Sequence, residues 1–293
     1  MPYLINPAQL EKFRKSQKNV IVLDVTWHFK GSGQAKDEYL EHHIEGARFL
    51  DLEAFCDKDA CHAKMVTRDE QQIADILGKL GITNDHKIIF YDNSNLHTSC
   101  RALWMFKVFG HNPNLLYILD GGYDGWVKHG GNIETGEPKP ALSKDYKVNY
   151  EAHYVRTLMQ MKTNLHHPAE QVVDVRNPVR YAGGPEDRPS LRPGHMPGSF
   201  CFPFTTLFET DGRFKPLDKI RKQLTGIGVD LAYPIVTSCG SGTTAPILNF
   251  VLDLLGHEKH AVYNGSWTEW GADKLYPGES SVDERPVVTS LDT

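Results

Sequence analysis

A short glycine-containing loop holds the residues of this sequence that are best suited to nucleophilic chemistry. It reads Cys239-Gly240-Ser241-Gly242-Thr243-Thr244 and lies between an apolar run, 234–238, that predicts a buried strand and a helical pattern over 245–255. The two glycines allow a tight turn with inward-pointing N–H groups, and the helix adds the positive end of its dipole. We therefore expect an anion at the centre of the loop, and a cysteine at its entrance that ionises and acts as a nucleophile.

Other chemistries require residues that this loop lacks. A dinucleotide site needs a third glycine and a P-loop needs Gly-Lys-Ser/Thr, and neither is present. A cysteine phosphatase needs an arginine six positions after its cysteine, where this chain has Ala245. The alternative that stays open is an inert, buried cysteine before an ordinary strand-to-helix turn.

The chain contains two copies of one sequence pattern, the second roughly 150 residues after the first. Blocks recur in the same order: 20–25 as 171–175, His43-Ile-Glu-Gly as His195-Met-Pro-Gly, 109–111 as 255–257, and 121–126 as 265–270. Aligning the two copies places Asp92 opposite Cys239. The first-copy loop has no thiol and no paired glycines, so only the second copy carries the reactive loop.

Each copy alternates short β-branched runs with helical segments, which predicts an α/β fold with a mostly parallel central sheet flanked by helices. Strands are expected over 20–25, 87–91, 115–119, 171–175, 234–238 and from 262, with helices over 101–109 and 245–255. A stretch rich in Gly, Pro and Lys separates the copies. The predicted domains are 1–135 and 150–276, joined by a linker, 136–149, and followed by a polar C-terminal tail, 277–293.

The composition argues against several classes of partner. The 293 residues carry a net charge of -5, with a sequence pI of about 6.3, which gives no broad attraction to nucleic acid or anionic lipid. No apolar run approaches the roughly 20 residues of a membrane helix. The histidine pairs 42–43 and 166–167 lack the partners of a metal site, so neither a metal nor an organic cofactor is expected.

The cysteines indicate the compartment. There are five, irregularly spaced, which does not suit a disulfide framework: Cys56, Cys61, Cys100, Cys201 and Cys239. The first residues show no basic stretch followed by an apolar core, so no secretory signal is expected. We expect a cytoplasmic protein that is a monomer.

At this point a resemblance becomes specific. A tandem repeat with Asp92 in the first loop, Cys239 in the second, and recurring His-x-x-Gly and Gly-x-x-x-x-Trp blocks resembles the two-domain rhodanese superfamily, over about residues 4–275. The neutral Gly240 and Ser241 make the loop similar to that of 3-mercaptopyruvate sulfurtransferases, since thiosulfate-preferring members typically carry basic residues there. The resemblance implies two rhodanese-like domains, of which the first is non-catalytic.

The resemblance also implies a reaction. Cys239 takes sulfur from 3-mercaptopyruvate as a persulfide and passes it to cyanide or to a thiol acceptor such as thioredoxin, with loop residues 240 and 242–244 holding the anion. The substrate carboxylate is assigned to Arg180 and Arg188, with Arg176 and Arg192 as second choices. The alternatives are a thiosulfate-preferring enzyme of the same fold and a non-catalytic rhodanese-like binding module.

One departure from the family pattern concerns proton transfer. The resemblance implies a catalytic role for Ser241, in a relay with an aspartate and a histidine of the first domain. In the matching stretch Glu53 stands in place of the aspartate and Lys64 in place of the histidine, with His62 close by.

Overall fold

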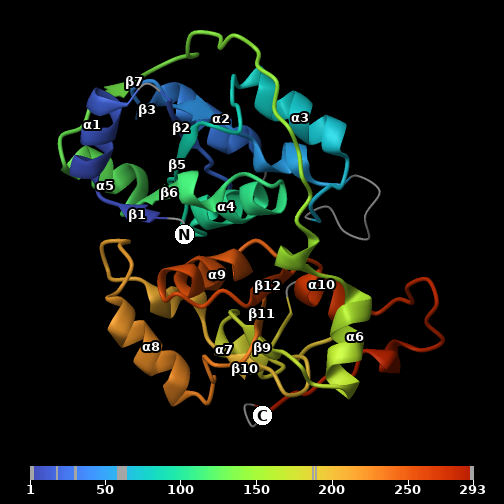
Figure 1. Cartoon of the computed structure of the whole chain (residues 1–293). Coiled ribbons are helices and arrows are strands. Elements are labelled where there is room, and N and C mark those ends of the chain that lie inside the picture. The colour runs from blue at the N-terminus through green and yellow to red at the C-terminus, as the bar shows by residue number, and fades with distance from the viewer. Residues whose placement is uncertain are drawn as a thin grey trace. The chain divides into compact units, whose positions relative to one another are not determined.

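The computed structural model describes residues 3–17, 19–29, 32–57, 65–186, 188 and 190–290. Over these residues the chain forms two compact units. The N-terminal unit comprises 3–57, 66–151 and 209–214, and the C-terminal unit comprises 152–208 and 215–290 together with residue 65. Each unit has its own sheet, with helices beside it (Figure 1).

The N-terminal unit is built on a five-stranded parallel sheet in the order β1-β6-β5-β2-β4. Its strands are β1 (Tyr3–Ile5), β2 (Val20–Asp24), β4 (Arg48–Phe49), β5 (Lys87–Tyr91) and β6 (Leu116–Leu119). The short strands β3 (His43–Ile44) and β7 (Ile133–Glu134) pair antiparallel beside it. The helices are α1 (Pro7–Ser16), α2 (Ser32–Glu41), α3 (Glu70–Lys79), α4 (Thr98–Val108) and α5 (Gly122–Lys128).

The C-terminal unit repeats this topology. Its sheet has the order β10-β9-β11-β12-β8 and is also parallel throughout. Its strands are β8 (Val155–Arg156), β9 (Gln171–Asp174), β10 (Phe200–Cys201), β11 (Ile235–Ser238) and β12 (His260–Tyr263). The helices are α6 (Leu158–His166), α7 (Pro178–Tyr181), α8 (Leu217–Gly226), α9 (Ala245–Leu254) and α10 (Ser266–Trp270). The predicted fold class, two α/β domains with parallel sheets flanked by helices, is confirmed.

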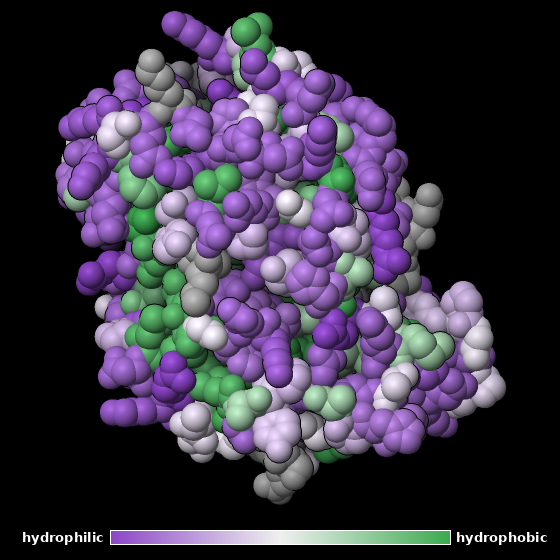
Figure 2. Space-filling model, in the orientation of Figure 1, coloured by the Kyte–Doolittle hydropathy of each residue, from purple (hydrophilic) through white to green (hydrophobic). Residues whose placement is uncertain are grey.

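Alternate side chains of the central strands pack against helices on opposite faces of each sheet. In the N-terminal unit Ile89 of β5 packs in one core with Trp126 of α5. Its neighbour Phe90 contacts Phe106 of α4, with ring centroids 5.0 Å apart. In the C-terminal unit Val236 packs with Trp267 in the same manner. Hydrophilic side chains cover most of the face shown in Figure 2, as expected when the apolar residues fill these cores.

The duplication extends to single side chains. His43 and His195 are fully buried, stack on Tyr39 and Tyr181, and bond the backbone carbonyl of the same tyrosine through Nδ1. This shared position, at the turn before β4 and β10, indicates a structural role for both histidines. The first helix of each unit also begins with a capping box, which fixes where the helix starts.

The segment predicted as a polar tail makes specific contacts over its described part. Val288 forms a β-bridge with His195. This bridge is equivalent to the pairing of β7 with His43 of β3 in the N-terminal unit. The guanidinium of Arg285 is buried and donates to the carbonyls of Glu269, Trp270 and Ala272. Residues after the predicted domain end therefore complete the edge of the C-terminal unit.

Among the described residues, no helix has the length and apolar character needed to cross a membrane. Nor does this part of the chain contain a cluster of three or more His, Cys, Asp or Glu side chains arranged to hold a metal ion.

Candidate active site

Cys239 follows β11 directly and lies at the carboxyl edge of the C-terminal sheet. Its backbone N–H donates to the hydroxyl of Ser266 at 3.1 Å, and its carbonyl accepts from the N–H of Trp267 at 3.0 Å. The Ser266 hydroxyl lies 3.9 Å from the Cys239 sulfur. Only 1% of Cys239 is exposed, so the start of α10 holds the thiol in a fixed, nearly dry position.

The loop after Cys239 turns back to begin α9. Gly242 adopts a left-handed φ of +79°, which glycine tolerates and other residues rarely do. The hydroxyls of Ser241 and Thr243 are hydrogen-bonded to each other at 3.2 Å. Thr244 is the N-cap of α9 and makes no side-chain cap to it. The first turn of α9 is therefore open to an external anion.

The two predicted arginines are brought to this loop. A side chain built at Gly240 would meet Nη1 of Arg180 and Nη2 of Arg188, each at 3.6 Å from the added Cβ. Arg188 also donates to the hydroxyl of Thr268, which itself donates to the carbonyl of Gly240 at 2.7 Å. Both guanidinium groups thus lie beside the residue that follows the nucleophile, where a carboxylate clamp is needed.

Glu186 joins the two arginines and was not predicted from the sequence. Its carboxylate accepts from Nη2 of Arg180 at 2.8 and 2.9 Å and from Nε of Arg188 at 3.1 Å, with 6% of its side chain exposed. Burial acts to raise the pKa of Glu186, but the hydrogen bond from Arg180 and the two positive charges outweigh burial and lower it. The carboxylate is therefore ionised at neutral pH and orients both guanidinium groups.

The second-choice arginines have structural tasks. Arg176 is 4% exposed, pairs with both oxygens of Asp174, donates to the Gly194 carbonyl and lies over the Trp267 ring at 4.4 Å.

Arg192 donates to backbone carbonyls within the C-terminal unit, those of Trp270, Gly271, Val282 and Arg285. Among the described residues, the nitrogens of both guanidinium groups are taken up by such bonds, except for Nη1 of Arg176, which is buried without a partner. The geometry favours Arg180 and Arg188.

The corresponding loop of the N-terminal unit is already occupied by a carboxylate of the protein. Asp92 follows β5 as Cys239 follows β11. Its side chain accepts from the N–H of Ser94 at 3.1 Å and from the N–H of Ser99, in the first turn of α4, at 2.9 Å. This bond also explains why α4 begins at Thr98, three residues before the predicted start. The carboxylate of Asp92 therefore takes the N–H donors that an external anion would need in this loop.

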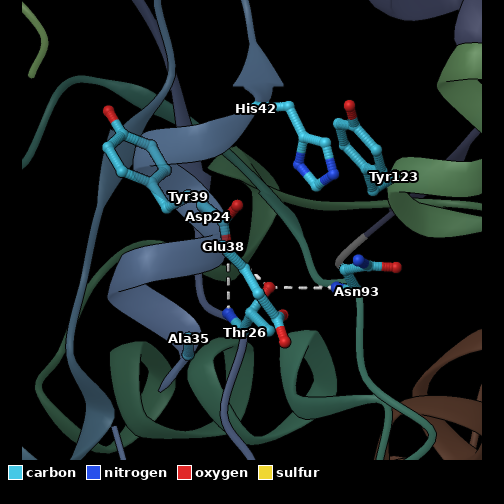
Figure 3. A pocket seen from close by; sticks show the side chains of 8 residues that line it. All are labelled: Asp24, Thr26, Ala35, Glu38, Tyr39, His42, Asn93 and Tyr123. Atoms are coloured by element: carbon cyan, nitrogen blue, oxygen red, sulfur yellow. Dashed lines mark hydrogen bonds between the residues drawn. The ribbon is translucent and has the colours of Figure 1, made fainter. Parts of the chain in front are cut away.

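A second difference between the units lies next to Asp24, in the part of the N-terminal unit drawn in Figure 3. Thr26 stands at the position of Arg176 and donates its hydroxyl to Asp24. His42 stacks on Tyr123, with ring centroids 5.0 Å apart, in the way that Arg176 lies over Trp267. A cavity of about 10 Å³ is left, enough for one water molecule. Burial raises the pKa of Asp24, which lacks the arginine partner of Asp174.

The predicted relay is only partly within the described residues. Glu53 accepts a hydrogen bond from the indole N–H of Trp27 at 2.8 Å, inside the N-terminal unit. Lys64 and His62 lie outside the described residues, as does Cys61. The relay through Ser241 stays a prediction.

The fold and the loop geometry agree with comparison to known proteins. The Rhodanese-like domain family matches residues 6–129 and 157–273, and the chain belongs to this family, with two copies of the domain. It is 36% identical over 255 residues to the thiosulfate sulfurtransferase of Bos taurus, covering 85% of this chain and 84% of the relative. It is 33% identical over 253 residues to the 3-mercaptopyruvate sulfurtransferase of Homo sapiens, covering 85% and 84%.

A solved structure shows the same similarity. SseA from Escherichia coli, described with the rhodanese fold and the catalytic mechanism of 3-mercaptopyruvate sulfotransferases, superposes with a TM-score of 0.80 at 28% identity. The match covers 91% of this chain and 99% of SseA. The similarity therefore extends over both units.

Proposed function

We propose that the protein is a sulfurtransferase that takes sulfur from 3-mercaptopyruvate onto Cys239 and passes it to a thiol or to cyanide. The observation that carries the proposal is the position of Cys239 at the mouth of an uncapped helix, with two guanidinium groups beside Gly240. A thiolate, an anion cradle and a carboxylate clamp in one place suit a small 2-oxo acid that carries sulfur. The relatives named above support the same reaction class.

The first half-reaction loads the cysteine. The donor carboxylate binds Arg180 and Arg188, and the Cys239 thiolate attacks the donor sulfur. The carbon–sulfur bond breaks, its electron pair goes to carbon, and pyruvate leaves as an enolate that takes up a proton. The Ser241 hydroxyl is our candidate for guiding that proton. The backbone N–H groups of the loop and the first turn of α9 hold the persulfide charge.

The second half-reaction regenerates the free Cys239 thiolate from its persulfide. An acceptor thiolate or cyanide attacks the outer sulfur of the persulfide, the sulfur–sulfur bond breaks, and the Cys239 thiolate is restored. No external oxidant or reductant is consumed by the two steps. A small dithiol protein of the thioredoxin type is the proposed physiological acceptor. The irregular cysteine pattern supports a reducing, cytoplasmic setting. A monomer is the proposed oligomeric state.

A second candidate is the same transfer with thiosulfate as donor, favoured by the relatives named thiosulfate sulfurtransferase. The deciding measurement is kcat/KM for each donor with cyanide as common acceptor. We expect 3-mercaptopyruvate to have the higher value, and a higher value for thiosulfate would overturn the donor assignment. Intact mass after incubation with donor tests the transfer itself: a protein that never gains one sulfur atom would be a binding module.

The carboxylate clamp predicts a binding defect. Arg180→Lys and Arg188→Lys keep the positive charge but lose the fixed two-pronged donor, so KM for 3-mercaptopyruvate is expected to rise about 10- to 100-fold. The turnover number is expected to change much less, since the clamp binds the ground state and the transition state alike.

Initial-rate kinetics at several donor concentrations check this prediction. Arg221→Lys is the matched control, because Arg221 is an exposed residue of α8. Equal KM values for all three variants and the wild type would show that the carboxylate binds elsewhere.

A further inference from the structure

We propose that Glu186 determines donor specificity by setting the charge of the donor pocket, so that the pocket favours a donor with one negative charge over a donor with two. The proposal rests on the proposed function, because it concerns the same clamp. It assigns a task to a residue that acts through the two clamp arginines, to which its carboxylate is bonded.

The hydrogen bonds of Glu186 leave particular nitrogens for the donor. The carboxylate occupies Nη2 of Arg180 and Nε of Arg188. A Cβ built at Gly240 would lie 3.6 Å from Nη1 of Arg180 and from Nη2 of Arg188, neither of which bonds to Glu186. Nη2 of Arg180, which does bond to Glu186, would lie at 3.7 Å. Among the described residues, Nε of Arg180 and Nη2 of Arg188 are buried without a hydrogen-bond partner. Glu186 thus fixes both guanidinium groups beside the loop, and Nη2 of Arg188 is left for the donor.

The charges of these three side chains sum to one positive charge. Two guanidinium groups contribute two charges, and the carboxylate of Glu186, almost fully buried between them, removes one. A donor with a single carboxylate neutralises this clamp, and the charge of the Cys239 thiolate is the same for either donor. A dianion such as thiosulfate brings a second charge into a partly solvated site in which the clamp has no cation left to pair it, which is costly. Discrimination through an unpaired charge on the wrong ligand is a general means of specificity.

A purely positional role for Glu186 would have a different consequence. If the carboxylate only kept the arginines in place, its loss would weaken both donors by a similar factor. If its charge matters, the loss of the charge lowers the affinity for the monoanion relative to the dianion. The ratio of kcat/KM for thiosulfate to kcat/KM for 3-mercaptopyruvate separates these roles, whereas the absolute rates do not.

The test compares three variants with the wild type, using cyanide as acceptor. Glu186→Gln removes the charge and keeps an oxygen acceptor, and the ratio is expected to rise about tenfold, as for one charge acting over a few ångströms in a partly solvated pocket. Glu186→Asp keeps the charge, so the ratio is expected to stay within about threefold of the wild type. Glu258→Gln removes a charge from an exposed position of the same unit and is expected to leave the ratio unchanged.

Equal losses for both donors in Glu186→Gln, or an unchanged ratio, would overturn the proposal while sulfur transfer through Cys239 stands. Absence of a sulfur adduct on wild-type Cys239 with either donor would instead overturn the proposed function.

A measurement on the wild-type protein tests the charge argument even if Glu186→Gln does not fold. Pyruvate, a monoanion, is expected to protect Cys239 from alkylation at about tenfold lower concentration than sulfate, a dianion; the reverse order would refute the charge argument.

Discussion

Replacement of Cys239 by serine is expected to abolish sulfur transfer, with kcat reduced by at least about 1000-fold. A serine hydroxyl beside the same amides stays protonated at neutral pH and cannot form a persulfide. The variant is expected to fold, because the bonds that hold residue 239 come from its backbone N–H and carbonyl. Steady-state turnover with 3-mercaptopyruvate and cyanide, and intact mass after incubation with donor alone, measure the two parts of this prediction.

Cys201→Ser is the matched control. Cys201 is a partly buried thiol of the same unit, and burial raises its pKa to about 11, so it is protonated at neutral pH and a poor nucleophile. The control is expected to keep nearly full turnover and to gain one sulfur atom like the wild type. If Cys239→Ser gained one sulfur atom and Cys201→Ser gained none, Cys201 would be the nucleophile instead.

Repeated sequence blocks were sufficient to predict the architecture. The offset of roughly 150 residues between the copies required two similar domains, and the alternation of strand and helix patterns required parallel sheets. The same alignment placed Asp92 opposite Cys239, and the structure puts both directly after equivalent strands. These predictions succeeded because the strand-to-helix turn is encoded locally, by an apolar run, a loop and a helical pattern in sequence.

The partner of the arginines could not be predicted in this way. Glu186 lies in a Gly- and Pro-rich stretch with no periodic pattern, and its neighbours in sequence include another acid, Asp187. What distinguishes Glu186 is its burial between Arg180 and Arg188, which depends on how the chain folds back after α7. An acidic residue between two candidate clamp arginines was the only signal available.

Arg285 shows the same limit for the domain boundary. A polar segment rich in charged and small residues predicts a tail, yet Arg285 is fully buried with Glu279 as its ion partner. The carbonyls to which Arg285 donates come from the end of α10 and the turn that follows. Hydropathy alone does not predict burial of an arginine, because burial depends on acceptors supplied by distant parts of the chain.

The ion pair beneath the active-site loop predicts a large loss of stability. Asp174 is fully buried and binds Arg176 through both oxygens. Asp174→Asn leaves the guanidinium charge without its partner, which typically costs about 3–5 kcal/mol of unfolding free energy. Urea unfolding of the full chain, followed by intrinsic fluorescence of Trp267 and the other tryptophans, measures the change.

Asp24→Asn provides the internal control, because Asp24 occupies the equivalent position of the N-terminal unit but accepts from the neutral N–H and hydroxyl of Thr26. Asparagine keeps an oxygen acceptor for these bonds, and no cation is left unpaired, so the loss is expected to stay below about 1 kcal/mol. The two variants also differ in pH dependence. Burial raises the folded-state pKa of Asp24, so its contribution to stability is fully present below the unfolded pKa and is lost as pH rises through the folded value.

The stability of Asp24→Asn relative to the wild type is therefore expected to increase from acid toward neutral pH. Unfolding curves at a series of pH values test the sign. Equal losses in the two aspartate variants at neutral pH would show that the arginine is not what makes Asp174 indispensable. The expected contrast instead follows from one difference between the copies. Where Thr26 stands, the buried carboxylate has no counter-charge. Where Arg176 stands, the paired carboxylate of Asp174 lies at the end of β9, beside the end of β11 from which the loop of Cys239 leaves.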